Sequence, residues 1–184
     1  EAGTKSRTLE GMIAALAELP LEFSPGTAWN YSVSTDVLGY LVGKISGSSF
    51  EEFLHAELLE PLGMVDTDFW VPENKAQRLA ACYMATPDGG MKLADDPANS
   101  RLLRPATCFS GGGGLVSTLA DYNRFCQMMV EGGVLEERRY LSRKTVELMG
   151  SNHLPGHAYL PDLSVSMFAE ATYNGVGFGL GFSV

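Results

Sequence analysis

The spacing of apolar positions predicts helices over much of the first 62 residues. Within residues 8–19, apolar side chains recur every three or four positions on one stripe: Leu9, Met12, Ile13 and Leu16. A second helix is predicted from Ser34 to Gly47, with an inward face made of Val37, Leu38, Leu41 and Ile45. A third begins after Ser49, which is placed to form a capping box with Glu52.

The second half of the chain mixes helices with short strands. Thr118 is placed to cap a helix whose buried face is predicted to be Leu119, Tyr122, Phe125, Cys126 and Met129. Another short helix starts near Ser142, and residues 81–94 predict a hairpin around Asp88-Gly89-Gly90. Residues 173–184 alternate glycine with apolar residues, which favours a strand packed closely against a neighbour. These patterns predict an α+β domain that is dominated by helices.

Composition and charge narrow the class of protein. Of the 184 residues, 45% are hydrophobic and 19% charged, as in soluble globular proteins. A net charge of −9 repels phosphate backbones, so we expect no nucleic-acid partner. No apolar run approaches the ~20 residues that cross a bilayer, so we expect no membrane partner.

Cysteine and histidine give no metal signature. Cys82, Cys108 and Cys126 are widely spaced, which argues against a disulfide framework or a zinc site and favours a reducing compartment such as the cytoplasm. His153 and His157 are four residues apart, but Pro155-Gly156 between them disfavours a helix, so a surface loop is expected. His55 is interpreted as structural or exposed. The sequence implies no metal and no organic cofactor.

The stretch "FSPGTAWNYSVSTDVLGYLVGKIS" (residues 23–46) places Tyr31 between a tight turn and a helix. One interpretation is a ring packed beside Trp29 with its hydroxyl on the backbone. The other is a phenol held for proton transfer. Because a free phenol has a pKa near ~10, the second interpretation needs a neighbouring cation that lowers it.

Three phrases occur together and in order: "FSPGTAWNYS", "SFEEFLHAELLEPLGMVDTDF" and "GGGGLVSTLADYNRF". Over roughly residues 20–184 the chain resembles the serine β-lactamase-related family, which includes class C β-lactamases, DD-peptidases and esterases. The resemblance implies the mostly helical lobe of that fold. It also implies acyl transfer by a serine and a lysine from an S-x-x-K motif, a tyrosine that moves protons, and a third K-T-G or H-x-G motif on a strand.

The resemblance assigns roles to four residues. Tyr31 in "YSV" matches the family's catalytic tyrosine. Val33 stands where β-lactamases and DD-peptidases usually keep an asparagine that binds a substrate amide, which favours ester substrates. Gly112 and Gly113 fall where lactamases often place a larger residue. They either widen the substrate pocket or allow close packing, and the sequence leaves both alternatives open.

The other two motifs are absent from these 184 residues. No serine has a lysine three positions later, "KTV" at 144–146 lies in a predicted helix, and no histidine begins an H-x-G. We therefore expect residues 1–184 to form a single partial domain. It would lack the N-terminal S-x-x-K region and the C-terminal K-T-G or H-x-G strand of the family. Such a domain is either a piece of a larger enzyme or a naturally shortened protein.

Two hypotheses of function follow. In the first, the parent is a serine hydrolase acting on a small-molecule ester or amide, and this chain alone is inactive because it lacks the nucleophile. In the second, the chain is a non-catalytic domain that binds a small ligand or a protein. The predicted strand at residues 173–184 would have an unpaired edge, so we also expect a homodimer or strand exchange through it.

Overall fold

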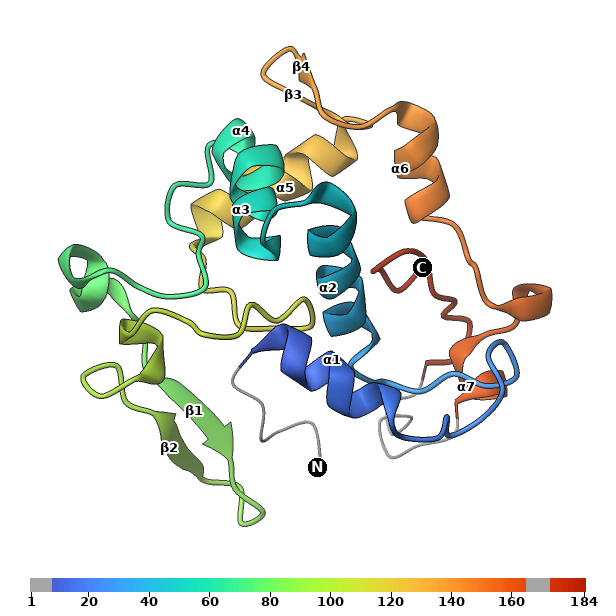
Figure 1. The fold of residues 1–184 in the computed structure, drawn as a ribbon, viewed down its shortest axis with the longest axis horizontal. Helices are drawn as coiled ribbons and strands as arrows, with labels where there is room; N and C mark the ends of the chain where they lie inside the picture. Colours follow the sequence, from blue (N-terminus) through green and yellow to red (C-terminus); the bar gives the residue numbers. More distant parts are fainter. Residues whose placement is uncertain (1–7, 165–172) are drawn as a thin grey trace.

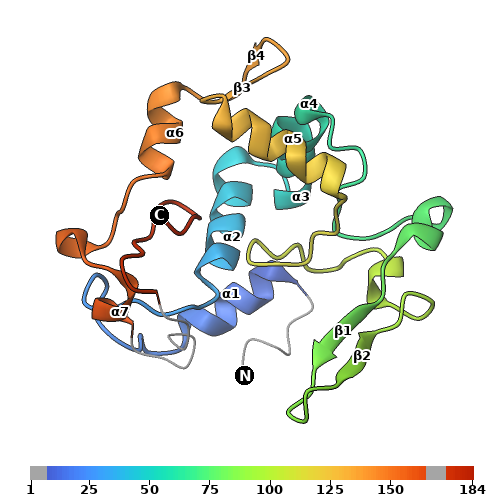
Figure 2. The ribbon, with the colours of Figure 1, turned by 180° about the vertical axis from the view of Figure 1, so that it is seen from behind.

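The computed structural model describes residues 8–164 and 173–184, and it is mainly helical (Figure 1). The α-helices are α1 (Leu9–Ala17), α2 (Ser34–Ser46), α3 (Phe50–Leu54), α4 (Glu60–Leu62), α5 (Leu119–Val130), α6 (Arg143–Met149) and α7 (Leu160–Leu163). The strands form two antiparallel pairs, β1 (Cys82–Ala85) with β2 (Met91–Asp95) and β3 (Val134–Leu135) with β4 (Arg138–Arg139). Both views show the β1–β2 hairpin extending away from the helices (Figures 1 and 2).

Short-range capping explains where four of the helices begin. The side chains of Thr8, Ser49, Thr118 and Ser142 each accept a hydrogen bond from the backbone N–H three residues later. At Ser49 the box is complete, because the Glu52 carboxylate also accepts from the Ser49 N–H at 2.8 Å. Gly47 ends α2 in a left-handed conformation (φ 77°), which favours glycine. The predicted helix starts and the 81–94 hairpin are confirmed.

The core joins the end of the third predicted helix to α5 and β3. Its buried members are Leu59, Leu62, Met64, Met128 and Leu135. The Tyr140 hydroxyl closes this region by donating to the Pro61 carbonyl at 2.5 Å, and Arg124 donates to the Leu62 carbonyl. The largest fully buried side chains of the described part of the chain lie here.

The third predicted helix contains a π-helical segment, His55–Leu59, between α3 and α4. The Glu60 N–H bonds to the His55 carbonyl, five residues back. The wide turn lies directly before Pro61, which has no N–H and whose ring would clash with the carbonyl four residues earlier in a regular α-helix. π-helical turns of this kind are frequent at functional sites.

The predicted inward face of α2 is wrong for three of its four residues, since Val37 is half-buried. Leu38, Leu41 and Ile45 are 58%, 44% and 84% exposed, whereas the buried residues of α2 are Asp36 and Gly39. A Cβ added at Gly39 would lie 3.2 Å from the Phe50 ring, so α2 packs through its small residues rather than its large ones. An apolar stripe, Leu38, Leu41 and Ile45, is therefore left on the surface.

The predicted face of α5 is also partly wrong. Leu119 and Tyr122 are exposed, whereas Phe125, Cys126 and Met129 are half-buried. The fully buried side chain is Met128, and Asp121, two turns earlier on the same helix, is also buried. The helix turns this side inward because the Asp121 carboxylate accepts hydrogen bonds from the Asp66 N–H at 2.7 Å and the Thr67 hydroxyl at 2.9 Å.

The strand predicted at residues 173–184 is wrong as a regular element. The segment folds back on itself, with Gly177 N donating to Val184 O and Gly179 N donating to Phe182 O, both at 2.7 Å. It also contacts the end of α6, since Leu180 N donates to Met149 O at 2.9 Å. Glycine permits this turn because Gly181 has a φ of 89°. Among the helices that the structure describes, none has the length and apolar character needed to cross a membrane.

A charged cluster fixes the loop that follows α4. The Asp66 carboxylate contacts Lys75 Nζ at 2.8 Å and Arg78 Nη2 at 2.7 Å. Hydrogen bonds from Arg78 and then Lys75 lower the pKa of Asp66 to about 2, below the ~3.9 of an unfolded chain. A carboxylate with a lowered folded pKa stabilises the fold above the unfolded pKa, and this contribution is lost as the pH falls toward the folded one.

We therefore predict that Asp66→Asn lowers the urea midpoint of unfolding at pH 6, and that its difference from the unmodified protein shrinks as the pH falls from 4 toward 2. Circular dichroism across this pH range measures both midpoints. Glu57→Gln removes an equal charge from an exposed position and should leave the difference near zero throughout. A deficit of Asp66→Asn that stays constant down to pH 2 would contradict the ion-pair account.

Candidate functional site

A cavity of about 620 Å³ opens where the start of α2 faces the glycine-rich loop 110–114. All four residues with predicted site roles line it, namely Tyr31, Val33, Gly112 and Gly113. The remaining lining residues are Ser32, Thr35, Asp36, Arg101, Cys108, Ser110 and Gly114. The structure thus brings together side chains that lie about 80 positions apart in the sequence.

Tyr31 is held on an anchored turn with its side chain largely in solvent. Two residues earlier, the backbone N–H of Trp29 donates to the Leu163 carbonyl at 2.8 Å. The Trp29 ring packs against Phe178 at a centroid distance of 5.6 Å. Asn30 donates its side-chain N–H to Glu22 at 2.7 Å. Tyr31 itself is 62% exposed, so the cavity side of the turn is accessible to a substrate.

The residues between Tyr31 and α2 keep the turn in place. The hydroxyls of Ser32 and Ser34 are 2.7 Å apart, and the Ser34 N–H donates to the Ser32 hydroxyl at 3.3 Å. Val33 precedes the helix and is 43% exposed at the cavity wall. An apolar side chain at this point gives a bound substrate no hydrogen-bond partner.

Asp36 joins the two walls of the cavity. Its side chain is 7% exposed and accepts hydrogen bonds from the Ser110 hydroxyl at 2.5 Å and the Gly112 N–H at 3.4 Å. The carboxylate lies in the first turn of α2, where the helix dipole favours a negative charge. Sequence reasoning missed Asp36 and Ser110. The sequence signal for Asp36 was a carboxylate within the apolar helix that is predicted to begin at Ser34, just after Tyr31.

Two further lining residues were also missed. Arg101 supplies the positive charge among the residues of the cavity, and it comes from the short 3₁₀ helix Arg101–Leu103. Burial, followed by the nearby Asp36 carboxylate, raises the pKa of the Cys108 thiol. A raised pKa lowers the fraction of the thiolate, which is the reactive form, at neutral pH.

The glycines of the loop have different surroundings. A Cβ at Gly111 would lie 2.1 Å from the Thr35 carbonyl oxygen, and one at Gly112 would lie 2.8 Å from both Thr35 Oγ1 and Asp36 Oδ2. A Cβ at Gly113 would meet nothing within 4 Å. Close packing against α2 therefore explains Gly111 and Gly112, whereas Gly113 borders open space.

Comparison with known proteins gives consistent matches. The family model described as Beta-lactamase matches residues 1–182. Protein Rv1367c of Mycobacterium tuberculosis is 34% identical over 172 residues, which cover 94% of this chain and 41% of that protein. Esterase EstB of Burkholderia gladioli is 30% identical over 130 residues, covering 63% of this chain and 33% of the esterase.

A solved structure shares the fold. EstCE1, a hydrolase with promiscuous acyltransferase activity, superposes with a TM-score of 0.75 and 25% identity, covering 98% of this chain and 46% of that one. The chain thus spans less than half the length of each of these relatives.

The glycine surroundings give a matched pair of substitutions. We predict that Gly112→Ala lowers the free energy of unfolding by ~1–3 kcal/mol, because the added methyl group overlaps the side chains of Thr35 and Asp36. Gly113→Ala should stay within ~0.5 kcal/mol of the unmodified protein. Urea unfolding measures both values. Equal effects of the two substitutions would show that the loop does not pack against α2 in this way.

Proposed function

Because the chain belongs to the Beta-lactamase family, we propose that it supplies the tyrosine side of a site for acyl transfer on small esters or amides. The observation that carries the proposal is the cavity lined by Tyr31, Val33, Gly112 and Gly113. Two relatives support the reaction class, since one is named an esterase and the other a hydrolase with acyltransferase activity.

Tyr31 acts in this proposal as a proton shuttle. A serine hydroxyl attacks the carbonyl carbon of the substrate, and its proton passes to the Tyr31 oxygen, which the lysine of the S-x-x-K motif would stabilise as a phenolate, as the tetrahedral intermediate forms. The phenol then gives that proton to the leaving alcohol or amine when the bond to the carbonyl carbon breaks. Water hydrolyses the acyl-serine by the same two proton transfers in reverse order. The exposed position of Tyr31 at the cavity supports this role.

The sequence holds no S-x-x-K, so this proposal assigns the nucleophile and its lysine to polypeptide outside these 184 residues. One physical observation supports a larger catalytic domain. The apolar stripe on α2, Leu38, Leu41 and Ile45, lies uncovered. A contiguous apolar surface of this kind is normally buried against other protein, from the same chain or a second copy.

Val33 directs the proposed site toward esters. A substrate amide that enters beside Val33 loses its hydrogen bonds to water and gains none from this side chain, which costs about 1–3 kcal/mol. An ester oxygen is a weaker acceptor and loses less. The cavity therefore favours ester substrates over lactams and peptides.

An alternative function is binding without turnover. The cavity is present in these 184 residues and the nucleophile motif is not, so a domain that retains ligands in the family's pocket is the second candidate. Association of two copies is compatible with either function, and the α2 stripe is the surface that it would cover.

The assay that separates these functions compares this chain with the protein encoded by the gene's full reading frame. We predict no burst and no turnover of p-nitrophenyl butyrate by the 184 residues alone, and turnover by the full protein that a fluorophosphonate abolishes. In the full protein Tyr31→Phe should lower kcat by ~10²–10⁴ with a smaller change in KM. Tyr122→Phe, at an exposed position of α5, is the matched control. A full protein without S-x-x-K and without turnover would overturn the enzymatic proposal in favour of binding.

The specificity proposal has its own test. Val33→Asn in the full protein should raise the ratio of kcat/KM for a chromogenic lactam to that for the ester by ~5-fold, because one added hydrogen bond is worth ~1 kcal/mol. Val33→Leu keeps the wall apolar and should leave the ratio unchanged. A ratio unaffected by Val33→Asn would show that this position does not contact the acyl group.

A further inference from the structure

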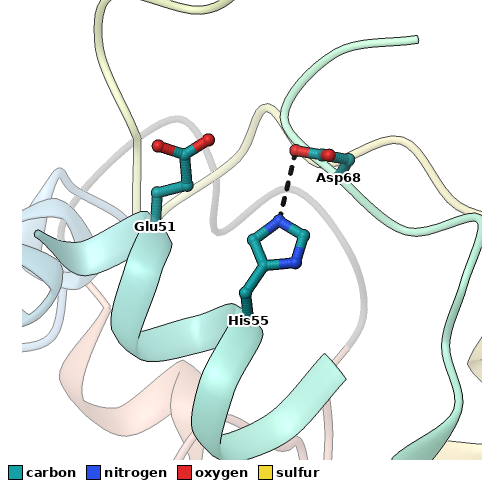
Figure 3. Close-up of side chains that lie close together, drawn as sticks. All are labelled: Glu51, His55 and Asp68. Atoms are coloured by element: carbon teal, nitrogen blue, oxygen red, sulfur yellow. Dashed lines mark ion pairs between the residues drawn. The ribbon is translucent and has the colours of Figure 1, made fainter. Parts of the chain in front are cut away.

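A second group of reactive side chains lies away from the Tyr31 cavity. Glu51 and His55 are four residues apart, on α3 and at the start of the π-helical segment, so they project from the same side. Asp68 approaches them from the loop after α4 (Figure 3). His55 Nε2 is 3.5 Å from Asp68 Oδ1, and one potential ligand atom from each residue lies within 4.8 Å of the others.

The backbone holds Asp68 in front of the helix. Its N–H donates to the Val116 carbonyl at 3.1 Å, and its carbonyl accepts from the Val116 N–H at 2.8 Å. The Phe69 N–H donates to Asp68 Oδ1 at 2.6 Å, which orients the carboxylate. The three side chains therefore converge without a change in the fold.

The cluster has more negative charge than its own contacts neutralise. All three residues are half-buried, and no described residue donates a hydrogen bond to the Glu51 carboxylate. With a neutral imidazole, the two carboxylates give a charge of −2, which a divalent cation balances.

The geometry matches metal ligands better than a hydrogen bond. The 3.5 Å between His55 Nε2 and Asp68 Oδ1 exceeds the ~2.7–3.2 Å of a normal N–H···O bond. Two ligands of a tetrahedral ion, each at ~2.1 Å from the metal, are ~3.4 Å apart. The ligand atoms of Glu51, His55 and Asp68 already lie within 4.8 Å of one another. Small side-chain rotations are therefore enough to bring them to the spacing of metal ligands.

We propose that Glu51, His55 and Asp68 bind one divalent transition-metal ion, with Zn²⁺ the best match and water completing the coordination. An imidazole nitrogen suits Zn²⁺ and its neighbours in the first transition row, whereas Mg²⁺ and Ca²⁺ prefer oxygen ligands alone. The sequence had indicated no metal and a structural or exposed His55. The overlooked signal was the four-residue spacing of Glu51 and His55 on one predicted helix.

The bound ion acts as a clamp between α3 and the loop that carries Asp68. That loop continues into Phe69, whose ring packs against Phe50 at 6.0 Å and Phe109 at 5.1 Å. Phe109 directly precedes Ser110 of the cavity wall. The clamp therefore stabilises the packing behind the glycine-rich loop, and it does not depend on whether the cavity is catalytic.

The test is calorimetric titration of the chelator-treated 184-residue chain with ZnCl₂. We expect one equivalent to bind, a higher Tm with Zn²⁺ than without, and no competition from millimolar Mg²⁺ or Ca²⁺. Asp68→Asn and Glu51→Gln keep side-chain shape, and His55→Gln removes the imidazole. Each should weaken Zn²⁺ affinity by at least ~10-fold.

Two matched controls separate the site from general charge effects. Glu57→Gln removes the same charge from an exposed position in the π-helical segment. His157→Gln removes a histidine that is distant in the sequence from the proposed ligands. Both should bind Zn²⁺ like the unmodified chain, and circular dichroism confirms that each variant folds. Absence of a one-to-one Zn²⁺ event overturns the proposal. Equal loss in the controls, or full displacement by Mg²⁺, overturns it as well.

Discussion

The candidate site depends on the hydrogen bonds that the buried Asp36 carboxylate accepts. The donors are Ser110 and Gly112, and these bonds hold the glycine-rich loop against the first turn of α2. The turn that carries Tyr31 lies directly before this first turn of α2. A buried charge is tolerated only when it is paired or hydrogen-bonded, so removal of either donor would leave Asp36 unsatisfied and release one wall of the cavity.

The close approach of the glycine-rich loop also decides which side of α2 faces inward. The loop approaches so closely that a Cβ at Gly111 would overlap the Thr35 carbonyl, and Gly39 faces Phe50 with little room. Small residues therefore occupy the contact, and the larger Leu38, Leu41 and Ile45 face outward. A hydrophobic pattern read alone predicts the opposite, because it assumes that the largest apolar side chains are buried.

The features predicted correctly are those encoded within a few residues. The caps at Thr8, Ser49 and Ser142 need only a neighbour three positions away, and the 81–94 hairpin pairs residues at most 13 positions apart. The errors at α2, at α5 and at residues 173–184 arise from distant contacts. Asp121, for example, is turned inward by the loop at Asp66, 55 residues earlier. The family resemblance predicted that Tyr31 and Val33 lie at one pocket with Gly112 and Gly113. The structure was needed to show that Ser110 bonds to Asp36 and that Asp68 joins Glu51 and His55.

The central claim is that Tyr31 faces a serine supplied by polypeptide beyond these 184 residues. The most direct measurement is a crystal structure of the full-reading-frame protein after reaction with a fluorophosphonate. The account predicts a phosphonylated serine with its Oγ at a hydrogen-bond distance, ~2.6–3.2 Å, from the Tyr31 hydroxyl and beside the Asp36-anchored glycine loop. A label on a residue remote from this cavity, or Tyr31 turned away from the labelled serine, would contradict it.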